Sequence, residues 1–182
     1  DAFLGYSESR AESFKRAAEL AKKALSMDDT LSDVYALLGG LSLFQRQYEK
    51  AIAAGKKSIA LGPNSATSHV LFGYTMTYAG RYEEAIALIK KGMRLTPHYP
   101  AFYLNHLGRP YFQKGRYEEA LAIYEQLLER SRKGEFNPLA VHLNLAATYI
   151  MLGREEEARA HAAEVLRIDP NFSLEWIGKA SF

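Results

Sequence analysis

The sequence predicts an all-α fold built from repeated helix hairpins, and three observations point to it. Ala and Leu outnumber Val and Ile by 49 to 12, which favours helices because β-branched side chains lose rotamer freedom there. A six-residue string recurs, starting at residues 46, 80, 115 and 153. Prolines close three of the resulting units. A hydrophobic content of 48% excludes an intrinsically disordered chain.

The recurring string marks the middle of each repeat. Gly-Arg-Tyr-Glu-Glu-Ala occupies 80–85 and, without change, 115–120, while related strings occupy 46–51 and 153–158. A Leu-Gly, Phe-Gly or Leu-Ala pair precedes each string. We therefore expect every repeat to contain two helices with a tight turn at the string. Each hairpin leaves an apolar face that only a neighbouring hairpin can cover, which predicts a stacked solenoid.

The helix ends follow from apolar spacing and from helix-stopping residues. The first helix is predicted from apolar and small residues at helical spacing after Phe14, and Thr96-Pro97 is typical of the stops that end the later pairs. Pro110 lies inside a predicted helix, and we expect a bend or local irregularity over 106–110. The predicted helices cover 7–27, 32–45, 48–61, 66–79, 82–95, 101–114, 117–131, 139–152 and 155–168.

The two ends of the array are expected to be incomplete. The chain does not begin with Met, and we expect it to be cut from a longer protein. In the last segment, Leu174 and Ile177 share a helical face that would lie on 155–168, leaving Trp176 or Phe182 partly exposed for self-association. The predicted divisions of this single array are an incomplete N-terminal repeat at 1–31, repeats at 32–65, 66–100, 101–138 and 139–172, and a truncated C-terminal capping segment at 173–182.

The repeated residues resemble a known family, the tetratricopeptide repeat (TPR). The family pattern of an aromatic residue, Leu-Gly, Tyr, Ala and a closing Pro is met by Tyr35, Leu38, Gly39, Tyr48, Ala51 and Pro63, and by Phe72, Gly73, Tyr82, Ala85 and Pro97. The resemblance implies a right-handed superhelix of antiparallel helix pairs, a TPR superhelix, whose first helices line a concave groove. It implies a peptide-binding groove formed by Phe44, Tyr74, Tyr78, Asn105, Arg109, Phe112 and Gln113, to which the fourth repeat would add Ala140, Leu143, Ala147, Ile150 and Met151.

A narrower resemblance involves Gly80-Arg-Tyr-Glu-Glu-Ala-Ile-Ala-Leu-Ile-Lys-Lys91 and Arg167-Ile-Asp-Pro-Asn-Phe-Ser173. These strings are similar to the repeat regions of bacterial class III adenylate or guanylate cyclases and related signalling proteins. The paired metal-binding aspartates of a cyclase have no counterpart in this sequence. If the parent protein is a cyclase, the resemblance implies that this chain is its non-catalytic part.

Catalytic, cofactor and metal sites have no support in the sequence. The Glu pairs at 83–84 and 118–119 and the run at 155–157 fall in the first turn of the second helices, where carboxylates offset the helix dipole. No two histidines are three or four residues apart on one helix, and we interpret His69 and His142 as packed, hydrogen-bonded residues. We interpret Gly55 and Gly92 as close helix contacts rather than phosphate-binding glycines. There is no cysteine.

The sequence thus predicts a non-catalytic scaffold that binds a protein or peptide partner, or a neighbouring domain of its parent, in the concave groove. The alternative is a regulatory or dimerisation module of a class III nucleotide cyclase. A net charge of +2 argues against a nucleic-acid partner, and no export or membrane segment is visible. We expect a cytoplasmic protein without cofactor or metal, and a homodimer through the ends remains open.

Overall fold

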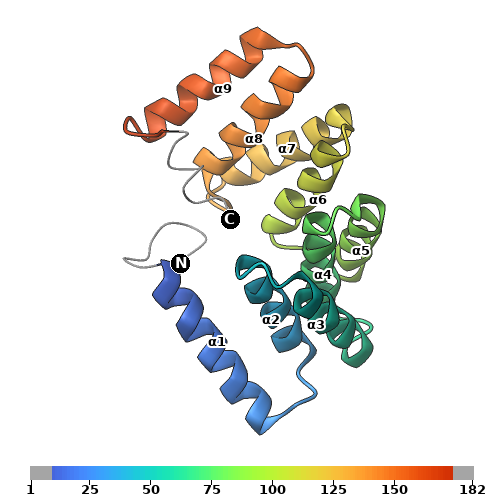
Figure 1. Cartoon of the computed structure of the whole chain (residues 1–182). Helices are drawn as coiled ribbons and strands as arrows, with labels where there is room; N and C mark the ends of the chain where they lie inside the picture. The colour runs from blue at the N-terminus through green and yellow to red at the C-terminus, as the bar shows by residue number, and fades with distance from the viewer. Residues whose placement is uncertain (1–9, 174–182) are drawn as a thin grey trace. The chain divides into compact units, whose positions relative to one another are not determined.

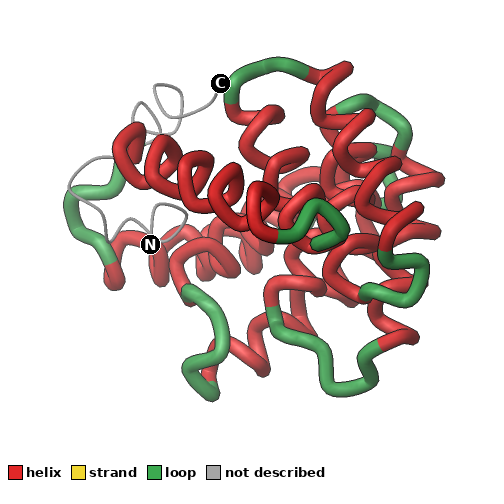
Figure 2. Tube along the Cα trace, turned by 90° about the horizontal axis from the view of Figure 1, so that it is seen from below, coloured by secondary structure: helices red, strands yellow, loops and turns green. Residues whose placement is uncertain are grey.

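A computed structural model of the chain describes residues 10–173, and these residues form α-helices and loops without a strand (Figures 1 and 2). Successive helices are joined by short loops, and those on either side of each turn string pair as an antiparallel hairpin. This arrangement confirms the predicted all-α solenoid of repeats. The predicted capping segment beyond Ser173 and the predicted start of the first helix at residues 7–9 lie outside the described residues.

The chain divides into two compact units, and the first covers Asp1–Pro97. Within it α2 pairs with α3 and α4 pairs with α5, while α2 also packs on α4 and on α1. Asp33, near the start of α2, accepts hydrogen bonds from Ser65 Oγ (2.5 Å) and Ser68 Oγ (3.2 Å) at the start of α4. Neighbouring hairpins are therefore tied together at their ends. The helices are α1 (Arg10–Met27), α2 (Ser32–Phe44), α3 (Tyr48–Leu61), α4 (Ala66–Tyr78) and α5 (Tyr82–Leu95).

The second unit covers His98–Phe182 and contains two further hairpins. In it α6 pairs with α7 and α8 pairs with α9, and α7 packs on α8. The helix α6 continues through Pro110 to its last residue, so the irregularity predicted there does not interrupt the helix. Proline has no N–H to donate to the carbonyl of His106, and α6 continues without this hydrogen bond. The helices are α6 (Phe102–Gln113), α7 (Tyr117–Arg132), α8 (Pro138–Met151) and α9 (Glu155–Ile168).

The turn inside each hairpin has the same backbone geometry in all four repeats. At Gly80 the backbone adopts a φ of 73°, and the next N–H, of Arg81, donates to the carbonyl of Met76 at 2.9 Å. This turn ends the helix and requires a residue in the left-handed backbone conformation, which glycine adopts without steric cost. The first hairpin makes the same turn with Arg46, at a φ of 57°. One repeat therefore uses a non-glycine residue where the others use glycine.

The arginine after each turn glycine binds the glutamate three residues later. Arg81 Nε donates to Glu84 at 2.8 Å, and Arg116 and Arg154 bind Glu119 and Glu157 in the same way (the Arg154 bond is 2.8 Å). Because these pairs are exposed to solvent, they are weak. Their position confirms that the glutamate clusters are solvated residues of the first helical turn.

Close helix crossings hold the hairpins together. A Cβ atom on Gly55 of α3 would lie 2.1 Å from the Phe72 ring of α4, and one on Gly92 would lie 2.6 Å from a methyl group of Val70. Both glycines are thus close helix contacts, as the sequence predicts. In the first unit Phe72 and Met76 are core residues against which Ile52 and Leu88 pack.

Replacing Arg46, whose backbone is in the left-handed conformation, should stabilise the chain. We expect Arg46→Gly to raise the free energy of unfolding by about 0.5–1 kcal/mol, because the left-handed strain outweighs the extra entropy of an unfolded glycine. Denaturant unfolding measures this change in the unfolding free energy, provided that the m-value of the variant equals that of the parent. The matched control is Gly80→Ala, whose Cβ would meet no atom within 4 Å. It should lose about 1 kcal/mol through backbone conformation alone, and equal stability of Arg46→Gly and the parent would contradict the assignment.

The crossing at Gly55 should tolerate no methyl group. We expect Gly55→Ala to lower the unfolding free energy by about 1–3 kcal/mol, since overpacking against Phe72 exceeds the gain in helix propensity. Gly40 is a control in α2, because a Cβ there would meet nothing within 4 Å. Gly40→Ala should gain up to about 1 kcal/mol. Thermal or urea unfolding of both variants measures their stability. A stabilised Gly55→Ala would show that the helix crossing has room for a methyl group.

Candidate functional site

The residues predicted to form the groove all reach the surface of their own unit. Phe44, Tyr74 and Tyr78 belong to the first unit, and Asn105, Arg109, Phe112 and Gln113 belong to the second. Gln113 is exposed and the other six are half-buried. Their joint role in one groove stays a prediction.

In the first unit the two tyrosines form a pair on α4. Tyr74 Oη donates to Tyr78 Oη at 3.1 Å, and the rings meet edge to face with centroids 5.0 Å apart. Phe44 lies in a different setting, because its ring stacks on Phe14 of α1 at a centroid distance of 4.6 Å. Phe44 thus contributes to the contact between α1 and α2 while remaining partly exposed.

In the second unit an amide pair joins the first helices of the two hairpins. Asn144 Nδ2 of α8 donates to Asn105 Oδ1 of α6 at 2.9 Å. Arg109 follows Asn105 by one helical turn, so both lie on one face of α6. On α8 the side chains of Ile150 and Met151 are 57% and 49% exposed, although both are large and apolar. The first helices of the second unit therefore present amides, a guanidinium and exposed apolar side chains.

The charge of Arg109 influences the pKa values of two neighbouring side chains, those of His106 and Tyr124. Burial, and secondly the Arg109 guanidinium, lower the pKa of His106 to about 3. Burial also raises the pKa of Tyr124, which the same guanidinium lowers by a smaller amount. The ring of His106 meets that of Phe102 edge to face at 5.4 Å. His106 is consequently neutral near pH 7, and Arg109 provides the positive charge of this face.

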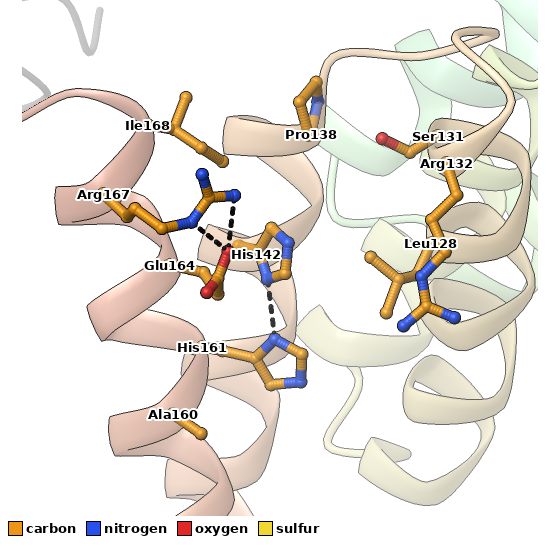
Figure 3. A pocket seen from close by; sticks show the side chains of 10 residues that line it. All are labelled: Leu128, Ser131, Arg132, Pro138, His142, Ala160, His161, Glu164, Arg167 and Ile168. Atoms are coloured by element: carbon orange, nitrogen blue, oxygen red, sulfur yellow. Dashed lines mark hydrogen bonds and ion pairs between the residues drawn. The ribbon is translucent and has the colours of Figure 1, made fainter.

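Of the two histidines interpreted as packed residues, one is a core residue and the other belongs to a pair. His69 is 1% exposed and its Nδ1 lies 2.8 Å from the Ser65 carbonyl, which confirms its packed role. His142 is half-buried, and its Nδ1 lies 2.8 Å from Nδ1 of His161 on α9 (Figure 3). Sequence reasoning considered only histidines on one helix and missed this pair. Within residues 10–173, no three His, Asp or Glu side chains are grouped to hold a metal.

A usable signal for the pair was present in the repeat register. Two positions of the repeat are relevant: one lies four residues before the second residue of the Leu-Gly or Leu-Ala pair, and the other lies three residues after the alanine that ends the turn string. In the fourth repeat these two positions are His142 and His161, whereas in the second they are His69 and Leu88. Two imidazoles therefore meet in the fourth repeat.

Comparisons with known proteins agree with the repeat fold. Residues 99–171 match the family described as Tetratricopeptide repeat, and residues 11–92 match that described as Anaphase-promoting complex, cyclosome, subunit 3. No curated protein sequence matches the chain significantly. Among the described helices, none has both the length and the apolar character needed to cross a membrane.

Solved structures with similar folds include three repeat proteins. MamA is 23% identical with a TM-score of 0.62, covering 86% of this chain and 83% of its own. A thermophilic TPR protein from Thermus thermophilus is 22% identical with a TM-score of 0.70, and the match covers 87% of this chain and 84% of that protein. YrrB, described as a TPR protein with an unusual peptide-binding site, is 18% identical with a TM-score of 0.65, and the match covers 93% of this chain and 85% of YrrB. At these identities the likeness shows a shared fold.

Acid should destabilise the chain through His106. Its folded-state pKa of about 3 lies below its ordinary value of 6.5. The unfolded chain therefore binds more protons between these values, and stability present above pH 6.5 is lost as the pH falls toward 3. We expect a loss of about 1 kcal/mol per pH unit in that window. Urea unfolding at about pH 7 and pH 5 measures it. His106→Gln should lose less on acidification, and an equal loss would assign the effect to other groups.

Proposed function

We propose that this chain is a non-catalytic scaffold of the tetratricopeptide repeat type, which binds an extended peptide or a segment of a partner protein on the first helices of its hairpins. The observation that carries the proposal is the set of groups that α6 and α8 of the second unit present, namely Asn105, Arg109 and the exposed Ile150 and Met151. These two first helices supply hydrogen-bonding and charged groups together with apolar side chains. Peptides present the same three kinds of group.

The polar residues of these two helices suit the backbone and an acidic group of a peptide. Each amide of the Asn105–Asn144 pair uses one of its groups for the other, and an asparagine side chain has further donor and acceptor capacity. The guanidinium of Arg109 can bind a carboxylate through two parallel hydrogen bonds. We therefore expect the bound segment to contain an acidic side chain or a free C-terminus near Arg109.

The apolar residues suit anchoring side chains. Ile150 and Met151 are exposed at the end of α8, and Phe112 is half-buried at the end of α6 against Tyr117 at 5.4 Å. Burial of such side chains supplies most of the affinity in peptide recognition, whereas the polar contacts fix the register. The bound segment should therefore carry an apolar residue within a few positions of its acidic group.

The tyrosine pair of the first unit supports a second contact surface. Tyr74 and Tyr78 are hydrogen-bonded to each other and half-buried, so their rings are already ordered before a partner binds. Ordered aromatic side chains lose little entropy on binding. The described peptide-binding site of YrrB supports peptide recognition by a protein of similar fold. The alternative of a regulatory module of a nucleotide cyclase rests on sequence resemblance alone.

Replacing Arg109 should weaken peptide binding without unfolding the chain. The probes are peptides selected against the full chain from a random displayed library. We expect Arg109→Ala to raise their Kd by about tenfold, because a charge-assisted hydrogen-bond pair is lost. Fluorescence anisotropy with labelled peptides measures the Kd, and thermal unfolding measures stability.

The matched control is Arg94→Ala, an exposed arginine in the last turn of the second helix α5. It should leave the Kd unchanged. A loss of stability in Arg109→Ala as large as that of a core deletion would show that Arg109 is structural. Selected peptides that bind Arg109→Ala as tightly as the parent would place the binding surface elsewhere.

A further inference from the structure

The second unit contains a pocket of about 430 Å³ among α7, α8 and α9 (Figure 3). Leu128 and Arg132 of α7 face His161 and Arg167 of α9, and His142 of α8 lies between these two helices. A volume of this size falls within the range of small-molecule sites. The pocket is lined by second helices as well as by α8, and a ligand here does not depend on the proposed function.

The histidine pair has a defined hydrogen-bonding state. Because the two Nδ1 atoms are 2.8 Å apart, one ring donates its Nδ1–H and the other accepts it. The accepting ring then carries its own hydrogen on Nε2, so it can donate to a further group. His161 is also stacked on Tyr149 at a centroid distance of 5.4 Å and an interplanar angle of 8°. The pair is therefore held in place before any ligand arrives.

The charges at the pocket leave one arginine that can exchange its partner. Arg167 binds Glu164 within α9 with a shortest distance of 2.8 Å, and because Glu164 itself lines the pocket, release of this arginine would leave a carboxylate beside any bound anion. Arg132 binds Glu129 on the surface of α7, where the two side chains are 65% and 64% exposed. Ion pairs that are this exposed are weak. A ligand anion in the pocket can therefore take the place of Glu129 on Arg132.

The remaining lining is apolar. Leu128 of α7 and Ile168 of α9 contribute aliphatic side chains, and Pro138 contributes its ring. A ligand that fills the pocket must therefore present both an anionic group and a hydrophobic body. A fully hydrated inorganic anion would leave the aliphatic lining without contacts.

We propose that this pocket binds a small monocarboxylate with an apolar body. Its carboxylate lies between Arg132 and the histidine pair, and its apolar body lies against Leu128 and Ile168. The carboxylate receives a charge-assisted hydrogen bond from the guanidinium and one from the Nε2–H of the accepting imidazole.

The charges around the pair give this binding a pH dependence. Burial lowers the pKa of both His142 and His161, the neighbouring His142 lowers that of His161 further, and Arg132 lowers both. Arg167 also lowers the pKa of His142, whereas Glu164 raises both values and Glu125 raises that of His161. The pair is therefore largely neutral at pH 7. A bound carboxylate favours the protonated form, so binding takes up a proton and strengthens as the pH falls.

The test is a titration of the full chain with hexanoate, followed by NMR of the imidazole Cε1–H resonances. We expect saturable shifts for His142 and His161 and none for the exposed His98, with a Kd several-fold lower at about pH 6 than at about pH 8. Arg132→Gln should raise the Kd by about tenfold. Arg159→Gln removes a similar exposed pair with Glu155 on α9 but leaves the pocket unchanged, and its Kd should equal that of the parent.

Two probes distinguish the ligand class. Hexanamide has nearly the same shape without the charge, and binding as tight as that of hexanoate would overturn the carboxylate assignment. Inorganic phosphate has the charge without the apolar body, and tighter binding of phosphate would overturn the requirement for that body. The absence of saturable hexanoate shifts, or an unchanged Kd in Arg132→Gln, would overturn the proposal as a whole.

Discussion

The packing of a large side chain against a glycine on the facing helix is the constraint on which the hairpins depend. Phe72 lies against Gly55, Tyr124 lies against Gly108, and a Cβ on either glycine would meet the aromatic ring at less than 2.5 Å. Such contacts bring two helices close enough to bury a continuous apolar core between hairpins. The turns and the exposed charges then decide where each helix stops, without setting how closely the helices pack.

Most of the fold was predictable because its determinants are local and repeated. The helices 48–61, 82–95 and 155–168 begin and end where the sequence predicts, since a left-handed turn residue and a closing proline act within one or two residues. The exposed position of the glutamate clusters followed from the same local rule. Pro110 does not end α6, which continues to Gln113, and the bend expected over 106–110 stays a prediction.

The candidate site was less predictable, because it depends on contacts between residues far apart in sequence. Surface exposure of Tyr74, Tyr78 and Arg109 follows from helical periodicity, but the stacking of Phe44 on Phe14 depends on how α1 packs. The bond between Asn105 and Asn144 joins residues 39 positions apart. Only the repeat register relates such positions in advance, and it does so for backbone positions rather than for side-chain conformations.

The identical turn strings at 80–85 and 115–120 have a consequence for insertions and deletions of whole repeats. Both copies fold into the same helix stop, with the same arginine–glutamate pair after it. Unequal recombination between the two copies would add or remove one helix of each neighbouring hairpin, and the junction would fall inside a turn that is unchanged. The chain could therefore gain or lose 35 residues between the two strings without acquiring a new turn sequence.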